Sequence, residues 1–139
     1  MSTLSLPVLL GIRPGMRVSV LNAPEGFLER LAPLPEGVAL IDNSKTGLDL
    51  TLYFSTKKTD LLEKLPVLAR GMAVTGHIWV CFPAATETSQ CPTEDFVRVA
   101  ALEIGLSDDK KLVVDAGWTG LRLAWKPRAP RLEKPQISA

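Results

Sequence analysis

The chain has 139 residues, of which 46% are hydrophobic and 22% charged, and its formal net charge at pH 7 is +1. This length predicts one domain with an ordinary buried core, and the composition is that of a globular protein. Domains that bind nucleic acid through bulk electrostatics are clearly basic, so a nearly neutral chain argues against a nucleic-acid partner. No apolar run is long enough to span a bilayer, and we therefore expect no membrane partner either.

The N-terminal segment and the cysteines bear on localisation. The apolar run Leu6–Ile12 is short and no basic segment precedes it, which is not the pattern of a signal peptide. Two cysteines, Cys81 and Cys91, are too few for a disulfide framework. Both observations lead us to expect a cytoplasmic protein.

The first predicted strand and helix enclose a turn that raises the question of a ligand. Residues 16–21 form the strand and residues 24–31 form the helix. Asn22 and Glu25 have the spacing of a capping box for that helix, and Gly26 follows. In a nucleotide-binding α/β protein, a glycine-rich phosphate loop would occupy this position.

Two strands and a second helix come next. The strands are predicted at 38–41 and 48–54, and the helix is predicted to be capped by Thr59. Because a proline ring displaces the carbonyl four residues before it, we expect Pro66 to kink or split this helix.

A further strand and helix follow. Residues 77–82 are apolar on both faces, as in a central strand that helices cover on each side. The next helix is predicted to be capped by Thr93 and to end at Gly105.

The last two predicted strands form a hairpin. They span 111–116 and 121–126 and are joined through 117–120. Trp118 lies in this connection, where it is either exposed for contact with a partner or folded back over the sheet edge. We favour the second interpretation.

Strands that alternate with helices and then close with a hairpin predict a three-layer, Rossmann-like α/β sheet. We expect four parallel strands, with the hairpin adding an antiparallel strand, in one domain of residues 1–126. Residues 127–139 form a proline-rich basic tail that is expected to be disordered. This is a reduced class I methyltransferase plan, since residues 42–48 are too few for the helix–strand–helix unit that such enzymes have there.

Four segments of the chain are distinctive: GIRPGMRV at 11–18, VLNAPEGF at 20–27, PLPEGV at 33–38 and WTGL at 118–121. Together they resemble a family of short bacterial proteins of unknown function that is described as Rossmann-like or methyltransferase-like. The match covers about residues 8–126, and VLNAPEGF and WTGL are its most specific parts. The resemblance implies the fold and no activity. Such sequences often carry lysines after the fourth strand, where this chain has Ala84-Ala85, so the resemblance implies no basic site there.

Candidate binding residues follow the predicted strands, because open α/β sheets bind ligands beyond the carboxyl ends of their strands. These residues are Asn22, Glu25 and Gly26 after the first strand, Asp42 after the second and Thr56 after the third.

Each of these candidates has a structural alternative. Pro24 lacks an N–H group and Glu25 carries negative charge, which disfavours phosphate binding at the first turn. We favour the alternative that Asn22 and Glu25 cap the helix while Gly26 permits close packing. Asp42 either holds ribose hydroxyls, as in Rossmann folds, or forms an Asp-Asn-Ser turn.

The sequence predicts neither a metal site nor a catalytic residue. His77, Cys81 and Cys91 are zinc-ligand types, but His77 and Cys81 would lie about 13 Å apart on a regular strand. Cys81 is therefore interpreted as a small core residue. The single histidine has no Ser or Cys nucleophile motif to form a triad with.

Two functions remain open at this point. The first is a non-enzymatic domain that acts through an unknown protein partner or self-association, favoured by the missing glycine loop and the absence of an acid–base constellation. The alternative is a small methyltransferase or sensor that binds S-adenosylmethionine or a nucleotide. That ligand would contact Asn22, Glu25, Asp42 and Thr56, and only analogy of fold supports it.

Overall fold

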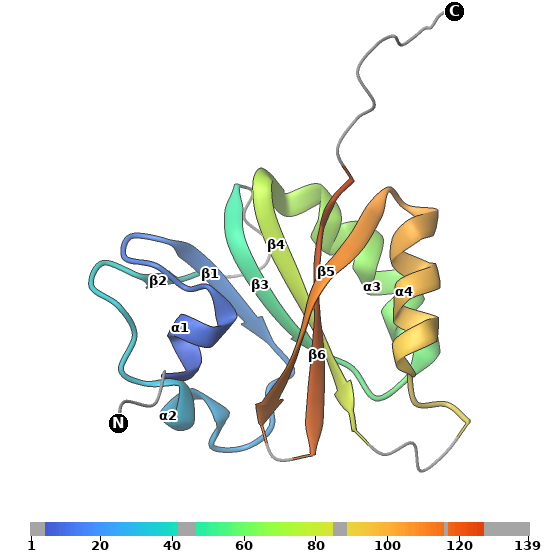
Figure 1. Ribbon diagram of the computed structural model, residues 1–139, viewed down its shortest axis with the longest axis horizontal. Coiled ribbons are helices and arrows are strands. Elements are labelled where there is room, and N and C mark those ends of the chain that lie inside the picture. Colours follow the sequence, from blue (N-terminus) through green and yellow to red (C-terminus); the bar gives the residue numbers. More distant parts are fainter. Residues whose placement is uncertain (1–4, 42–46, 85–88, 116, 127–139) are drawn as a thin grey trace, which may run out of the picture.

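The computed structural model describes residues 5–41, 47–84, 89–115 and 117–126, and they form a three-layer α/β fold (Figure 1). A single six-stranded sheet has the strand order β2-β1-β3-β4-β6-β5. In chain order the elements are α1 (Leu6–Leu10), β1 (Arg17–Leu21), α2 (Phe27–Leu31), β2 (Ala39–Leu40), β3 (Leu48–Phe54), α3 (Lys58–Gly71), β4 (Met72–Pro83), α4 (Glu94–Glu103), β5 (Leu106–Asp115) and β6 (Trp118–Trp125).

The directions of the strands confirm the predicted plan. Strands β2, β1, β3 and β4 are mutually parallel, β6 is antiparallel to β4, and β5 pairs with β6 as a hairpin. Residues 41–47 alone connect β2 to β3, so no helix–strand–helix unit separates them. The fold is therefore that of a class I methyltransferase in reduced form.

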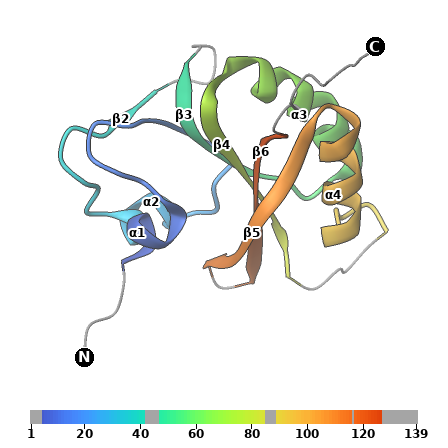
Figure 2. The ribbon, with the colours of Figure 1, turned by 45° about the horizontal axis from the view of Figure 1, so that its top comes forward.

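Helices cover both faces of the sheet, with α1 and α2 on one side and α3 and α4 on the other (Figure 2). Successive side chains of a strand point to opposite faces. In β4, Trp79 and Cys81 accordingly join the core under α1 and α2, whereas Ile78 and Val80 join the core under α3 and α4. This confirms β4 as a central strand buried on both faces, with Cys81 as a core residue.

Two of the three predicted helix caps are wrong. Helix α2 begins at Phe27 after Gly26, and no side chain caps it, because Asn22 lies too far back in the turn. Helix α3 begins before Thr59, and its N-cap residue Lys57 offers no side-chain cap either. The cap at Thr93 is confirmed, since the Phe96 N–H donates to the Thr93 hydroxyl at 3.2 Å.

Helix α3 is not split at Pro66, although the sequence predicts a kink or a break there. The helix runs unbroken on both sides of the proline. Its inward side chains, Leu61, Leu65 and Leu68, are all buried in the core. Tertiary burial of an apolar face stabilises helices more than propensity does, which explains why the proline is tolerated.

The hairpin differs from the prediction in its bounds. Its strands are longer than expected, since β5 runs to Asp115 and Trp118 is already the first residue of β6. The polar start of β5 is compatible with a strand because Asp108 accepts from Arg98 and Asp109 accepts from Arg122. Residues 127–139, the predicted disordered tail, lie outside the described residues.

Trp118 packs against the sheet, in agreement with the favoured interpretation. It is only partly exposed and contacts the core under α1 and α2. Its ring meets that of Phe54 edge-on, with 5.1 Å between centroids. Phe54 in turn meets Phe27 at 4.9 Å. These three rings fill the α2 side of the sheet at the carboxyl ends of the strands.

The indole of Trp79 offers a test of this packing. It is fully buried and its Nε1–H donates to the Leu10 carbonyl at 2.9 Å, which joins β4 to the end of α1. Trp79→Phe removes the donor and leaves that carbonyl without its partner. We expect the free energy of unfolding to fall by about 1–3 kcal/mol, measured by urea denaturation. The control Trp125→Phe, at a partly exposed indole, should have a smaller effect, and equal losses would contradict this account.

Candidate functional site

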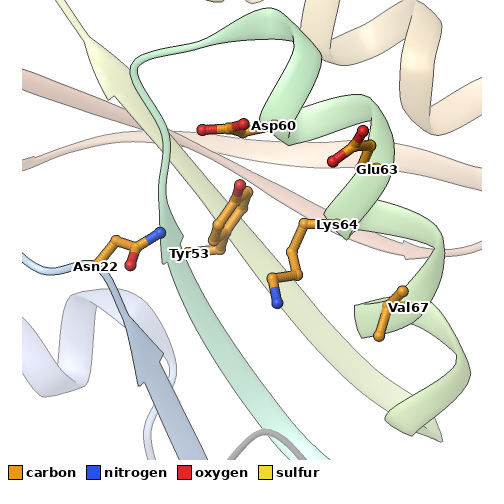
Figure 3. Close-up of a pocket in the computed structure, with 6 residues that line it drawn as sticks. All are labelled: Asn22, Tyr53, Asp60, Glu63, Lys64 and Val67. Carbon is orange, nitrogen blue, oxygen red and sulfur yellow. The ribbon is translucent and has the colours of Figure 1, made fainter.

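A pocket of about 260 Å³ opens where β1 and β3 end, on the side of the sheet that α3 covers (Figure 3). The two strands lie side by side here, since Leu21 pairs with Tyr53. We call this cavity the edge pocket. It is lined by Asn22, Tyr53, Asp60, Glu63, Lys64 and Val67.

Asn22 reaches the edge pocket through an unusual backbone conformation. Its φ of 59° is left-handed, and among the described residues other than glycine no other has a positive φ. Asparagine tolerates this region better than most residues with a Cβ atom. Its side chain extends from the end of β1 toward Tyr53 in Figure 3.

Tyr53 forms the floor of the edge pocket and presents a neutral hydroxyl group. The side chain is 2% exposed, and its hydroxyl points toward Asp60 (Figure 3). Burial raises the pKa of Tyr53, a hydrogen bond with Ser55 opposes this, and the charge of Asp60 adds to the rise. A phenol whose pKa is raised stays protonated at neutral pH and serves as a hydrogen-bonding group rather than as a nucleophile.

Helix α3 supplies the charged wall. Asp60, Glu63, Lys64 and Val67 line the pocket and lie on the side of the helix that does not carry its buried leucines. Two carboxylates against one ammonium give the pocket a formal charge of −1. Such a pocket favours a cationic or dipolar ligand over a phosphate.

The structure separates the residues that the sequence grouped into one site. Asn22 lines the edge pocket, but Glu25 and Gly26 belong to the turn before α2 and do not line it. Thr56 is exposed beyond β3 and does not line it either. Asp42 lies outside the described residues.

Arg30 holds the turn after β1 in place through hydrogen bonds. This turn is therefore not an open phosphate-binding loop. The Arg30 guanidinium donates to both carboxylate oxygens of Asp115 and to the Glu25 carbonyl. A Cβ atom added to Gly26 would lie only 2.8 Å from Arg30 Nη1, so this glycine allows the arginine to cross the turn. The prediction that Gly26 permits close packing agrees with this contact.

Sequence reasoning missed the contribution of α3 to the pocket. Positions 60, 63, 64 and 67 recur at helical spacing and fall between the buried positions 61, 65 and 68. That period shows which side of the helix faces away from the core. It does not show that this side borders the end of β1, because the contact depends on strand order.

The described residues contain no group of three or more His, Cys, Asp or Glu side chains placed to hold a metal ion. Burial raises the pKa of the Cys81 thiol, as expected of a core cysteine. Within the same residues, no helix has the length and apolar character required to cross a membrane.

Neither a family model nor a curated protein sequence matches the chain. Solved structures match it in fold. A possible exported protein from Bordetella parapertussis has a TM-score of 0.59 and 14% identity, over 88% of this chain and 66% of that one. A ribosomal protein L11 methylase from Lactobacillus delbrueckii subsp. bulgaricus has a TM-score of 0.57 and 15% identity, over 88% and 78%.

A third neighbour is a methyltransferase that was solved with its cofactor bound. The magnesium protoporphyrin IX methyltransferase of Synechocystis PCC 6803, solved with bound S-adenosylmethionine, has a TM-score of 0.54 and 9% identity, over 87% of this chain and 74% of that one. The protein has a methyltransferase-like fold. It spans about two thirds of the Bordetella chain and three quarters of the two methyltransferases. Identities this low show the fold alone.

The left-handed backbone of Asn22 gives a test of how the pocket is built. Asn22→Ala should lower the free energy of unfolding by about 1 kcal/mol, because a side chain with a Cβ atom is strained there. Asn22→Gly should preserve or raise it, since glycine adopts this conformation without strain. Urea denaturation of both variants measures the difference. If alanine and glycine had equal effects, backbone strain would not be the reason for asparagine at this position.

Proposed function

We propose that the protein binds S-adenosylmethionine, or a closely related adenosyl ligand, in the edge pocket. The observation that carries the proposal is the position of the pocket at the carboxyl ends of two neighbouring parallel strands. Open α/β sheets bind their ligands at these ends. Among the structural neighbours is a methyltransferase solved with this cofactor bound.

The charge of the pocket supports a cationic ligand. S-adenosylmethionine carries a sulfonium and an ammonium group against one carboxylate, which gives it a net charge of +1. Asp60 and Glu63 would attract the two cations, and Lys64 is placed to pair with the carboxylate. The excess negative charge disfavours a nucleotide with several phosphates.

The size of the pocket implies that it holds only part of the ligand. Small-molecule sites usually measure about 300–1,000 Å³, and the edge pocket is slightly smaller. We assign to it the amino-acid and sulfonium part of the ligand. The ribose would extend toward the carboxyl end of β2, and the sequence prediction of Asp42 as the partner of its hydroxyls remains a prediction.

Binding, rather than methyl transfer, is the function we propose. The group at the floor of the pocket is the Tyr53 hydroxyl, which is protonated at neutral pH and whose pKa burial raises further. A protonated phenol is a poor base for a methyl acceptor. The described geometry fits a module that senses or retains the ligand.

Stabilisation by the ligand tests the proposal directly. A ligand that binds only the folded state adds roughly 2.7 kcal/mol at a hundredfold excess over its Kd, which in a domain of this size raises the Tm by several degrees. We expect S-adenosylmethionine to raise the Tm more than S-adenosylhomocysteine, which lacks the sulfonium charge. ATP and NAD should have no effect. No shift with any of these ligands would overturn the proposal.

Two variants locate the ligand. Glu63→Gln removes one negative charge from the pocket and should weaken binding of S-adenosylmethionine more than that of S-adenosylhomocysteine. Glu103→Gln, an exposed position at the end of α4, is the matched control and should change neither. Equal effects of the two variants would place the ligand elsewhere.

A second candidate function is self-association through the outer strands, and a specific observation favours it. Val113 on the outermost strand β5 is 68% exposed, and Leu40 on the opposite outermost strand β2 is 51% exposed. Exposed apolar outer strands pair readily with another chain. This is the form of protein contact that the described residues support best.

Light scattering after size-exclusion chromatography tests this second function. The wild-type chain should elute as a dimer or larger, and Val113→Lys should shift it to the monomer, because a charged side chain blocks edge pairing. Val99→Lys, at an exposed position on α4, is the control. A monomeric wild-type protein would exclude self-association and leave ligand binding unaffected.

A further inference from the structure

A larger cavity of about 600 Å³ lies at the other ends of the strands, on the side that α1 covers. We call it the amino-end cavity. It shares no lining residue with the edge pocket. Its volume falls within the range of about 300–1,000 Å³ that is usual for small-molecule sites.

The wall of the amino-end cavity is mostly apolar. Leu10, Ile12 and Leu50 are buried core residues that border it, and Val8 at its rim is half exposed. Pro14 and Pro35 add rigid apolar surface from the loops on either side. An apolar surface of this kind favours the hydrocarbon part of a ligand.

Two arginines give the cavity a positive charge. The guanidinium of Arg122 donates to the Asp109 carboxylate from Nε at 2.8 Å and from Nη2 at 3.2 Å. Its Nη1 turns to the cavity wall, where a Cβ atom on Gly11 would lie 3.5 Å away. Arg13 also lines the cavity, and in the described part of the chain no carboxylate pairs with it. The charge of Arg13 is therefore available to a ligand.

The pKa of the chain's single histidine, His77, responds to the charges around the cavity. His77 lines the cavity, with its Nε2 at 3.9 Å from Asp109 Oδ2. Burial lowers the pKa of His77, and the charges of Arg122 and Arg13 lower it further against the opposing effect of Asp109. Lys110, whose amine donates to the Leu9 carbonyl at 3.4 Å, adds a cation at the adjacent end of α1. The two arginines whose charges act on His77 thus outnumber the one carboxylate, Asp109, that does so.

We propose that the amino-end cavity is a second binding site, for a small amphipathic anion with a hydrocarbon body and a carboxylate head. The body lies along Leu10, Ile12 and Leu50, and the head pairs with Arg13 and Arg122 Nη1. This site is independent of the proposed adenosyl site, because the two lie at opposite ends of the parallel strands.

The experiment follows the imidazole signals of His77 by NMR while octanoate is added to the full chain. One histidine gives one set of signals, so the assignment needs no variant. We expect a saturable shift and a rise in the pKa of His77, since a bound carboxylate favours the imidazolium. Octanamide, which has the same chain length and no charge, should bind about tenfold more weakly.

Matched variants separate the site from general apolar binding. Arg13→Gln should weaken octanoate binding about tenfold and leave the Tm unchanged, because the side chain is exposed. Arg70→Gln, at an exposed position on α3 on the other side of the sheet, should change neither. The proposal is overturned if octanoate leaves the His77 signals unmoved. It is equally overturned if octanamide binds as tightly, or if the two arginine variants behave alike.

Discussion

The packing of Trp79 is the interaction on which the arrangement of this domain depends. Its indole lies in the middle of β4 and is completely buried. Its Nε1–H donates a hydrogen bond to the carbonyl of Leu10, the last residue of α1. Its ring lies against β6 on the other side. A Cβ atom at Gly120 of β6 would lie 3.0 Å from the ring and 2.9 Å from Val114 Cγ1, so any larger residue where β6 pairs with β4 would force these side chains to shift. One side chain therefore fixes how the N-terminal helix, the central strand and the closing hairpin meet.

This arrangement also explains why the edge pocket and the amino-end cavity lie at opposite ends of the strands. Helix α1 is held at Trp79, and the chain then turns back to enter β1, which leaves the amino-end cavity beneath Arg13. At the carboxyl ends, the rings of Phe27, Phe54 and Trp118 fill the α2 side. Among the described residues, the edge pocket opens on the other side, which α3 covers. The edge pocket thus lies on the α3 side of the carboxyl ends of β1 and β3.

Much of the fold could be predicted from the sequence because local patterns determine it. The apolar run at residues 77–82 predicts a strand that is buried on both faces. Residues 42–48 are too few to form a further helix–strand–helix unit. Caps at Asn22 and Thr59 failed because side chains of this type also suit turns and exposed helix positions. The edge pocket could not be predicted in full. The end of β1 lies near α3 because β1 pairs with β3 in the sheet, and local sequence patterns do not reveal this strand order. The cation cluster of the amino-end cavity joins Arg13 to Arg122 across nearly the whole described chain, and no local pattern records such a contact.

The strand order has a consequence for how the molecule is made. Strand β6 is the last described strand along the chain, yet it lies inside the sheet between β4 and β5. During synthesis, β4 therefore emerges with one edge unpaired until β6 arrives. Domains are made from the N-terminus at about 5–20 residues per second, so this interval lasts seconds. A nascent chain in this state exposes an unpaired strand edge, the feature that templates aggregation in other sheets.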